Sequence, residues 1–532
     1  MSDALNITFA QLNITVGDLK TSSRKILETL DNAKNSDLVV FPELYLTGYS
    51  PEDMVLNKGF LKDVANAADS ILAATEDAPP FLLPLPVEDN GHIYNSVYFC
   101  KNGKVEQVIY KQRLPYTSVF DEKRIFTAGI NDKPITLKGH KIGVLICEDL
   151  WGPEVCAALK ENGAESLIAL NASPYEDIKM QKRLDVIHAR ISETGLPLAY
   201  LNILGAQDDL IFDGNSLVMN ARGEITYQIP AFEESVDTFI FPDTEKLSPI
   251  TEISREESLY KACCLGLRDY VHKNGFEGIV LGLSGGIDSA LSMAIAVDSL
   301  GAENVKAVMM PSPFTSEESL SDAKACADAL GVSLDTIKIG HLMEELENTL
   351  PQLTGLAHEN MQSRLRGLIL MSLSNQYPKY MVLSTGNKSE VAVGYATLYG
   401  DMCGGYNAIK DLYKTDVFAL SRWRNTKSQV IPENIITKAP TAELRADQKD
   451  EDSLPPYPVL DKILHMLMEE DMPTSDIIEA GYEKETVLKV FSLLKQAEYK
   501  RRQAAPGPKL SAKAFGRDRR YPITNKYSED LS

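Results

Sequence analysis

The chain has 532 residues, of which 44% are hydrophobic and 24% are charged, and its formal net charge is −21. This length favours two or three globular domains, and the acidic balance argues against nucleic acids or anionic membranes as partners, because both select clustered Lys and Arg. The N-terminus lacks a signal-peptide pattern, no stretch approaches ~20 apolar residues, and the seven cysteines form no CxxC pair. We therefore expect a cytoplasmic protein that binds no membrane.

Strand-like and helix-like segments alternate through the first part of the chain, with Gly and Pro at the joins. This pattern predicts an α/β domain over residues 1–240, with a largely buried sheet. The predicted strands are 6–11, 38–41, 95–99, 142–147, 167–171 and 198–202, and the predicted helices include 22–34 and 178–193.

Three side chains of this part of the chain suggest a nucleophilic site. Glu43 follows the strand LVVF, Lys111 lies in YKQRLP, and Cys147 ends the strand IGVLIC. A Cys nucleophile needs a base to become a thiolate, which a carboxylate can provide, and a nearby Lys can stabilise an oxyanion. Taken alone, a Cys on an apolar strand is more often a buried structural residue. HExxH is absent and no His stands in a triad or metal spacing, so zinc is not expected.

Residues 231–255 (AFEESVDTFIFPDTEKLSPITEISR) are polar and contain two prolines, so we interpret them as a linker and place the boundary at 241–255. A second strand–helix alternation then predicts a doubly wound parallel sheet within residues 256–532. Its predicted strands are 278–283, 305–310 and 334–338, and its predicted helices are 256–273, 289–300, 316–330 and 359–375. The tail from Ala504, AAPGPKLSAKAFGRDRR, is basic, but its sequence does not indicate a role.

The turn GLSGGIDS joins a predicted strand to a predicted helix, where free N–H groups and the helix dipole favour an anion. It matches neither the Walker loop, because it has no Lys, nor the GxGxxG spacing. Asp288 beside phosphates is explained if it holds Mg²⁺. The alternative is a plain glycine-rich tight turn.

A second polar cluster, STGNKSEVAVGYATLYGD, also begins at a strand end, after Met381-Val382-Leu383. Glu390 is a candidate to share a metal with Asp288, and Lys388 and Lys414 are candidates to neutralise phosphate charge. Each of these charged residues, taken alone, is more often a solvated surface group.

Together with SGGIDS and STGNKSE, the motifs ENMQSRLRG, YGDMCGG, DLYKT, PTAELRADQKDED and YKRRQ resemble the NAD⁺ synthetase family over most of residues 256–532. The resemblance implies that ATP adenylates the nicotinate carboxylate of deamido-NAD⁺ and that ammonia then displaces AMP. It implies ATP binding by Gly282, Leu283, Ser284, Gly285, Gly286, Ile287, Asp288, Ser289, Thr385, Lys414 and Thr441, deamido-NAD⁺ binding by Asn360, Glu390, Asp401 and Lys500, and Mg²⁺ binding by Asp288 and Glu390.

The contexts PEL, KQRLP and CED resemble the nitrilase superfamily, and NASPYEDIK and GAQDDLIFDG extend the resemblance to its glutamine-hydrolysing members. The resemblance implies an N-terminal α-β-β-α sandwich over residues 5–230. It implies that Cys147 attacks the glutamine amide, that Glu43 is the general base, and that Lys111 supports the oxyanion.

Ser173 and Lys179 match glutamine-binding positions of these relatives. The chain departs from them at residues 114–122, where it reads LPYTSVFDE in place of LPNYGVFDE. Thr117 replaces the Tyr that would contact glutamine. Tyr116 stands one residue earlier and is the candidate substitute.

The two halves together resemble the glutamine-dependent members of the NAD⁺ synthetase family, which implies a homo-oligomer and a sequestered route for ammonia, since free ammonia protonates in water. Two alternatives stay open at this point. The same architecture could amidate another carboxylate, or the chain could be a catalytically silent nucleotide-binding protein.

Overall fold

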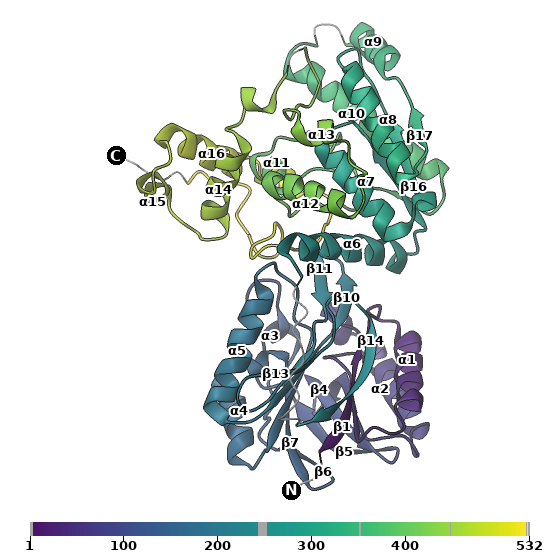
Figure 1. The fold of residues 1–532 in the computed structure, drawn as a ribbon, viewed down its shortest axis with the longest axis vertical. Coiled ribbons are helices and arrows are strands. Elements are labelled where there is room, and N and C mark those ends of the chain that lie inside the picture. The colour runs from purple at the N-terminus through teal and green to yellow at the C-terminus, as the bar shows by residue number, and fades with distance from the viewer. Residues whose placement is uncertain (1–3, 243–252, 351–352, 447, 528, 530–532) are drawn as a thin grey trace. The chain divides into compact units, whose positions relative to one another are not determined.

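The computed structural model describes residues 4–242, 253–350, 353–446, 448–527 and 529, and the chain divides into two compact units, Met1–Ile253 and Ser254–Ser532 (Figure 1). Among the described residues, no helix is long and apolar enough to span a membrane.

The first unit contains two six-stranded sheets, in the orders β14-β1-β2-β3-β4-β5 and β13-β12-β9-β8-β7-β6. The strands of the first sheet are β1 (Leu5–Gln11), β2 (Leu38–Val40), β3 (Phe81–Asp89), β4 (His92–Lys101), β5 (Lys104–Tyr110) and β14 (Ser235–Phe241). Those of the second are β6 (Ile135–Leu137), β7 (His140–Ile146), β8 (Ser166–Asn171), β9 (Leu198–Asn202), β12 (Leu217–Met219) and β13 (Ile225–Gln228). A separate hairpin pairs β10 (Leu204–Gln207) with β11 (Leu210–Asp213).

Helices cover the outer face of each sheet (Figure 1). Side chains of both sheets, such as Phe9 and Ile146, form one core between them, and Ile26 and Ile187 belong to the cores beneath the outer helices. The helical segments are α1 (Leu19–Asn32), α2 (Lys58–Ala73), α3 (Glu122–Ile125), α4 (Pro153–Glu161), α5 (Lys179–Thr194), η1 (Glu52–Leu56) and η2 (Cys147–Leu150). The predicted α-β-β-α sandwich is confirmed.

The interpretation of residues 231–255 as a linker is wrong for its first part. Residues 235–241 form β14, which pairs antiparallel with β1 at the sheet edge. Phe239 and Phe241 are buried while Ile240 is exposed, and the Phe239 ring meets Phe9 at 4.8 Å between centroids. The alternation in SVDTFIF is a strand pattern that the acidic surroundings concealed. Residues 243–252 lie outside the described part of the chain.

The second unit contains the predicted parallel sheet, in the order β17-β16-β15-β18. The chain runs outward from β15 to β17 and returns to the other side of β15, so the order reverses between β15 and β18. Ligands bind at such reversal points, beyond the carboxyl ends of the strands. The strands are β15 (Gly278–Gly282), β16 (Val305–Met309), β17 (Leu334–Thr336) and β18 (Tyr380–Val382).

Helices α9 and α10 contribute to a core with β15 and β16, and α6, α7 and α12 pack against one another. The helical segments around the sheet are α6 (Arg255–Lys273), α7 (Ile287–Leu300), η3 (Ala302–Asn304), α8 (Glu317–Leu330), α9 (Gly340–Thr349), α10 (Leu356–Gln376), α11 (Lys388–Val393), α12 (Lys414–Lys427), α13 (Glu433–Thr437) and η4 (Asp450–Asp452).

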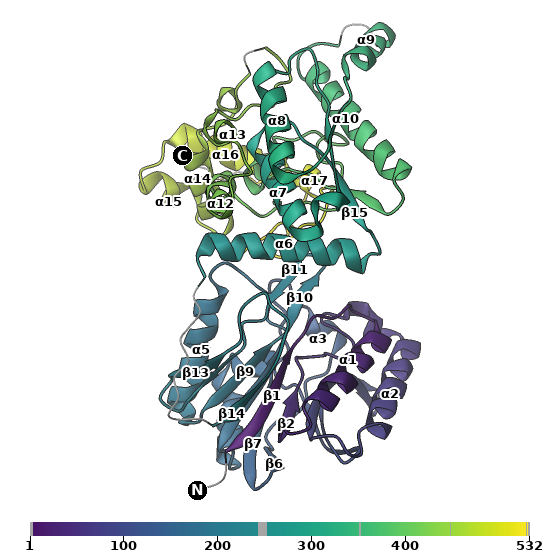
Figure 2. The same ribbon diagram turned by 45° about the vertical axis from the view of Figure 1, so that its right-hand side comes forward.

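A helical group completes this unit, and both views show α14, α15 and α16 together (Figures 1 and 2). Its apolar core includes Leu460, Ile477 and Val490, and it also holds Ala392 and Val393 of α11. The group therefore packs directly behind one of the predicted site segments. Its helices are α14 (Tyr457–Met468), α15 (Thr474–Glu479), α16 (Lys484–Gln496) and α17 (Glu498–Arg501).

Candidate active sites

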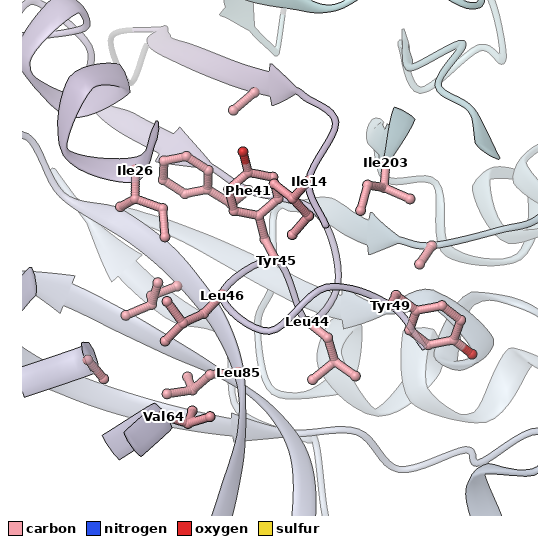
Figure 3. Close-up of a cluster of buried hydrophobic side chains, with 14 of the residues drawn as sticks. Ile14, Ile26, Phe41, Leu44, Tyr45, Leu46, Tyr49, Val64, Leu85 and Ile203 are labelled. Carbon is pink, nitrogen blue, oxygen red and sulfur yellow. The ribbon is translucent and has the colours of Figure 1, made fainter. Parts of the chain in front are cut away.

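Glu43 lies in the loop FPELYLTGY, which follows β2 and is almost wholly buried. Apolar side chains of this loop fix its path, and the Phe41 and Tyr45 rings stack with centroids 5.3 Å apart. Figure 3 shows the loop's side chains among those of the surrounding elements, with Phe41, Leu44, Tyr45, Leu46 and Tyr49 labelled. The packing holds a carboxylate at a position without water access, because Glu43 itself is 0% exposed.

Lys111, which follows β5, donates to two buried carboxylates. Its Nζ lies 2.7 Å from Oε1 of Glu43 and 2.9 Å from Oε1 of Glu122. Asn95 Nδ2 also donates to Glu43 Oε1 at 2.8 Å, and the N–H of Ala172 donates to Glu43 Oε2 at 3.1 Å. Both oxygens of Glu43 are therefore held in place.

Cys147 stands at the first position of η2, directly after β7, with a φ of +46°. Non-glycine residues adopt this left-handed region only when the surroundings hold them there, and such residues concentrate at functional sites. Asp149 supplies the restraint: its carboxylate accepts the N–H groups of Gln112, Arg113 and Ile146 at 2.8–3.2 Å. One carboxylate therefore ties the segment after Lys111 to the turn that carries Cys147.

Burial controls the electrostatics of this cluster. Burial raises the pKa of the Cys147 thiol well above its ordinary value and Glu43 adds to this, while Lys111 opposes it. Burial also raises the pKa of Glu122 to about 7, against the attraction of Lys111. For Lys111, burial lowers the pKa, but Glu122 and Glu43 outweigh it and the net pKa is raised. The thiol is thus protonated at rest beside an ammonium and two carboxylates, so it needs a base at the moment of attack.

The three predicted glutamine-binding residues are placed differently. Ser173 is buried, and its backbone oxygen accepts from Arg183 Nη2 at 2.8 Å. The Lys179 ammonium lies 4.9 Å from the centroid of the Trp151 ring. Tyr116 is 63% exposed, with the Lys123 ammonium 3.8 Å from its ring centroid. Tyr116 is therefore a surface residue in this structure.

A cavity of about 400 Å³ lies where the sheet order of the second unit reverses. Its lining includes these residues of the predicted ATP and dinucleotide sites: Gly282, Leu283, Ser284, Gly286, Ile287, Asp288, Ser289, Asn360, Thr385, Glu390, Asp401, Lys414, Thr441 and Lys500. The N-cap of α7 is Gly286, which has no side chain to cap the helix, so the first N–H groups of α7 are left for a ligand.

Gly285 is the one member of this set that does not line the cavity, and it serves the turn itself. Its φ is +80°, and a Cβ added there would lie 2.3 Å from the backbone oxygen of Ser319 in α8. Glycine is required for both reasons.

Charged side chains meet at the centre of the cavity. Lys414 Nζ lies 2.5 Å from Asp288 Oδ2 and 3.1 Å from Glu390 Oε1, and Asn387 donates to Asp288 Oδ1 at 2.9 Å. Asp450 also lines the cavity. Burial raises the pKa of Glu390 to about 8, which Lys414 opposes and Asp288 reinforces. Crowded carboxylates of this kind are stabilised by a cation.

Asn360 and Lys500 meet at one loop. Asn360 Oδ1 accepts from the Thr397 hydroxyl at 2.7 Å, and Lys500 donates to the backbone oxygens of Gly394 and Ala396 at 2.8 and 2.7 Å. Asp401 accepts from the N–H of Thr397 at 2.7 Å. The structure therefore joins three distant motifs on one cavity wall.

Lys388 does not lie in this cavity, so the hypothesis that it neutralises phosphate is wrong. It is fully buried, 3.0 Å from both Asp411 and Glu469, and it donates to the Ser511 hydroxyl at 2.6 Å. Asp411 also accepts the N–H groups of Leu510 and Ser511 at 2.8 and 2.7 Å. The start of the basic tail is thus anchored beside α11.

Comparisons with known proteins match both units of the chain. A family model described as carbon-nitrogen hydrolase matches residues 6–239, and one described as NAD synthase matches residues 259–504. The glutamine-dependent NAD(+) synthetase of Rhodobacter capsulatus is 46% identical over 99% of this chain and 100% of its own length. The chain belongs to the glutamine-dependent NAD⁺ synthetase family.

Solved structures of glutamine-dependent NAD⁺ synthetases are similar over the whole chain. The Acinetobacter baumannii protein, in complex with adenosine diphosphate, gives a TM-score of 0.79 at 41% identity and covers 98% of this chain and 99% of its own. The Cytophaga hutchinsonii protein gives 0.83 at 25% identity and covers 98% of each chain.

The sequence reasoning missed two carboxylates of this synthetase. Glu122 closes the segment LPYTSVFDE, and Asp450 lies in the acidic run KDED, so both were visible only as ordinary charges. Each is about 2–4% exposed, and buried acidic residues are rare unless paired. Their burial, which the sequence does not reveal, distinguishes them.

Proposed function

We propose that this chain makes NAD⁺ by amidating the nicotinate carboxylate of deamido-NAD⁺, using ATP and ammonia released from glutamine. One observation carries the proposal: a single chain holds both a buried Cys–Glu–Lys cluster and a nucleotide-type cavity at a sheet reversal point. Relatives of the same full-length arrangement, 41–46% identical, are glutamine-dependent NAD(+) synthetases. We assign the glutaminase to residues 1–240, the linker to 241–255 and the synthetase to 256–532.

In the glutaminase, Cys147 Sγ attacks the side-chain amide carbon of glutamine while Glu43 takes the thiol proton. The oxyanion of the tetrahedral intermediate is stabilised by the Lys111 ammonium. Glu43 then gives its proton to the leaving nitrogen, and ammonia departs from a glutamyl thioester. Water attacks the thioester with Glu43 again as base, which releases glutamate and the thiol.

Glu122 has a supporting role in this scheme. It accepts a second hydrogen bond from the Lys111 ammonium at 2.9 Å, and Tyr49 donates to it at 2.9 Å. Two acceptors on Lys111 keep it charged and oriented in a site where burial opposes charge. Ser173 and Lys179 are proposed to bind glutamine, and Tyr116 would have to move inward from the surface to join them.

In the synthetase, residues 282–289 bind the ATP phosphates with Thr385, Lys414 and Thr441, and Asn360, Glu390, Asp401 and Lys500 bind deamido-NAD⁺. The nicotinate carboxylate attacks the α-phosphorus of ATP, and pyrophosphate leaves. Ammonia attacks the resulting acyl adenylate, AMP leaves, and the amide of NAD⁺ is formed. The N–H groups at the start of α7 and the Lys414 ammonium hold the negative charge that develops on the phosphates.

Mg²⁺ fits the carboxylates of this cavity. Asp288 and Glu390 both reach the Nζ of Lys414, so their oxygens converge, and oxygen is the donor that Mg²⁺ takes. Among the described residues no group of three or more His, Cys, Asp or Glu side chains forms a cage. Mg²⁺ usually binds through one or two carboxylates plus phosphates, and it neutralises phosphate charge there.

The protonation of ammonia in water constrains how it can reach the synthetase site. Ammonia is largely protonated at neutral pH, and ammonium is not a nucleophile, so we propose a sequestered route between the two sites. We also propose a cytoplasmic homo-oligomer. Glutamine-supported NAD⁺ formation with stoichiometric ammonia in the medium would contradict the sequestered route.

The test of the proposed function compares NAD⁺ formation by the wild type and by Cys147→Ala, each with ATP, Mg²⁺, deamido-NAD⁺ and either glutamine or ammonium. We expect the wild type to use glutamine and the variant to make NAD⁺ from ammonium alone. If neither protein makes NAD⁺ from either donor while ATP still binds, the acceptor is a different carboxylate.

A further inference from the structure

Helix α14 presents a line of polar side chains to the elements that carry the cavity. Tyr457 and Asp461 are four residues apart in α14, so they share one face of the helix, and Glu469 is the C-cap that follows its last residue. The Tyr457 hydroxyl donates to Asp450 at 2.8 Å, and Glu469 accepts from Lys388 at 3.0 Å. Asp461 lies between them and contacts the two helices that hold the charged centre.

Asp461 caps helix α12 from outside that helix. The N-cap of α12 is Tyr413, whose hydroxyl is directed to Glu469, 3.0 Å away. The N–H of Thr415 donates to Asp461 Oδ2 at 2.9 Å, and the N–H of Lys414 donates to the Ser389 hydroxyl at 2.9 Å. Ser389 in turn donates to Asp461 Oδ1 at 2.5 Å. Two N–H groups at the start of α12 are thereby satisfied through one carboxylate.

This relay joins the backbones of two residues that act in the cavity. Ser389 directly precedes Glu390 in the first turn of α11, and Lys414 is the first residue of α12. Asp461 is 5% exposed and Ser389 is 0% exposed, so water does not readily replace their hydrogen bonds. Asp461 itself does not line the cavity.

We propose that Asp461 is a positioning residue of the synthetase site: through Ser389 and the first turn of α12 it fixes Lys414 relative to Glu390. This inference rests on the proposed function. Without the relay, α11 and α12 keep their apolar packing but lose the hydrogen bonds that set their relative register. Lys414 then spends less time against Asp288 and Glu390, and the adenylation step slows.

The test uses the full chain with Asp461→Asn, Ser389→Ala and the double variant. The matched control is Asp269→Asn, because Asp269 is also a 5% exposed carboxylate of this unit, ion-paired with Lys273 at 3.3 Å and outside the cavity lining. Adenylation is followed as exchange of labelled pyrophosphate into ATP with deamido-NAD⁺ present. We expect each single variant to lower the kcat of exchange about tenfold, as for a charged hydrogen bond. The KM for deamido-NAD⁺ should change less than the kcat, because Asn360, Asp401 and Lys500 are outside the relay and only Glu390, among the residues proposed to bind this substrate, lies next to Ser389.

A cycle of the two variants separates positioning from general destabilisation. If Asp461 acts through Ser389, the double variant should exchange within about twofold of either single variant. If the role of Asp461 is purely structural, the two decreases in the kcat of exchange should multiply to about a hundredfold. Asp269→Asn should then also lose activity in proportion to the decrease in its unfolding midpoint. If Asp461→Asn does not fold, Ser389→Ala decides, since a wild-type exchange rate in that variant would overturn the inference.

A second readout does not depend on activity. Lys414 is 2% exposed at its side chain, and its reaction with an acetylating reagent can be followed by peptide mass spectrometry. We expect labelling of Lys414 to rise several-fold in Asp461→Asn and Ser389→Ala but not in Asp269→Asn. Unchanged labelling would overturn the inference. A wild type that shows no exchange at all would instead disprove the proposed function.

Discussion

Replacing Gly285 by Ala should damage the turn GLSGGIDS without changing the cavity lining, to which Gly285 does not belong. The residue has a φ of +80°, and the new Cβ would lie 2.3 Å from a backbone oxygen of α8. A left-handed non-glycine residue costs of order 1–3 kcal/mol, and the contact is well inside normal van der Waals distance, so the turn and the start of α8 must separate. We expect a total loss of roughly 3 kcal/mol.

The neighbouring glycine provides the control. Gly286 has a φ of −91°, and its added Cβ would meet only the flexible Ser284 hydroxyl at 3.3 Å. Gly286→Ala should therefore fold normally, although it lines the cavity and can weaken ATP binding by crowding the phosphates.

The assay is thermal unfolding of the full chain together with pyrophosphate exchange. Gly285→Ala should lower the unfolding midpoint of the second unit by roughly 5 °C or more and reduce exchange, whereas Gly286→Ala should affect exchange alone. If the two variants unfold at the same temperature, the reasoning from backbone conformation is refuted.

Three further predictions concern buried charges. Lys111→Met leaves Glu43 and Glu122 without their cation and should lower the free energy of unfolding by about 3–5 kcal/mol. Thermal unfolding at several pH values should show this loss becoming smaller at lower pH, where the carboxylates are protonated. Burial raises the pKa of Glu122 from 4.5 to about 7, so between these pH values the folded chain holds a proton that the unfolded chain releases. The free energy of unfolding should therefore fall by about 3 kcal/mol as the pH rises from 4.5 to 7. Glu122→Gln should remove that decline, and parallel pH–stability curves for the two proteins would contradict the assignment. Asp411→Ala should release the tail at Ser511, so trypsin should cut after the otherwise buried Lys509, and an unchanged digest would show that the anchor is not required.

Much of the fold could be predicted from the sequence, because local patterns and tertiary structure agree there. The apolar runs that became β7, β8, β15 and β16 are short and bounded by turn residues, and the helices α5, α7 and α8 begin and end within two residues of their predicted limits. Strand β3 was missed because FLLPLPVED contains two prolines, which are rare in strands. β14 was missed because its apolar alternation lies in an acidic segment.

The residues of the candidate sites also include some that the sequence predicts and some that it does not. Residues within a contiguous motif, such as those around Asp288, could be predicted because a strand end and a helix start lie next to one another in the chain. Glu122, Asp450 and Asp461 could not, because their importance comes from burial and from partners far away in sequence. The role of Lys388 was misjudged for the same reason: its motif borders the cavity, while its side chain points to the tail.

The anchoring of the tail has a consequence for the order in which the protein is built. Asp411 takes its hydrogen bonds from Leu510 and Ser511, which are 99 and 100 residues later in the chain. At about 5–20 residues per second, a ribosome needs roughly 5–20 s to add them. Glu43, Lys111 and Cys147 all lie within the first unit, which is synthesised before the second begins. The half that matches the carbon-nitrogen hydrolase model is therefore fully synthesised well before the half that matches the NAD synthase model.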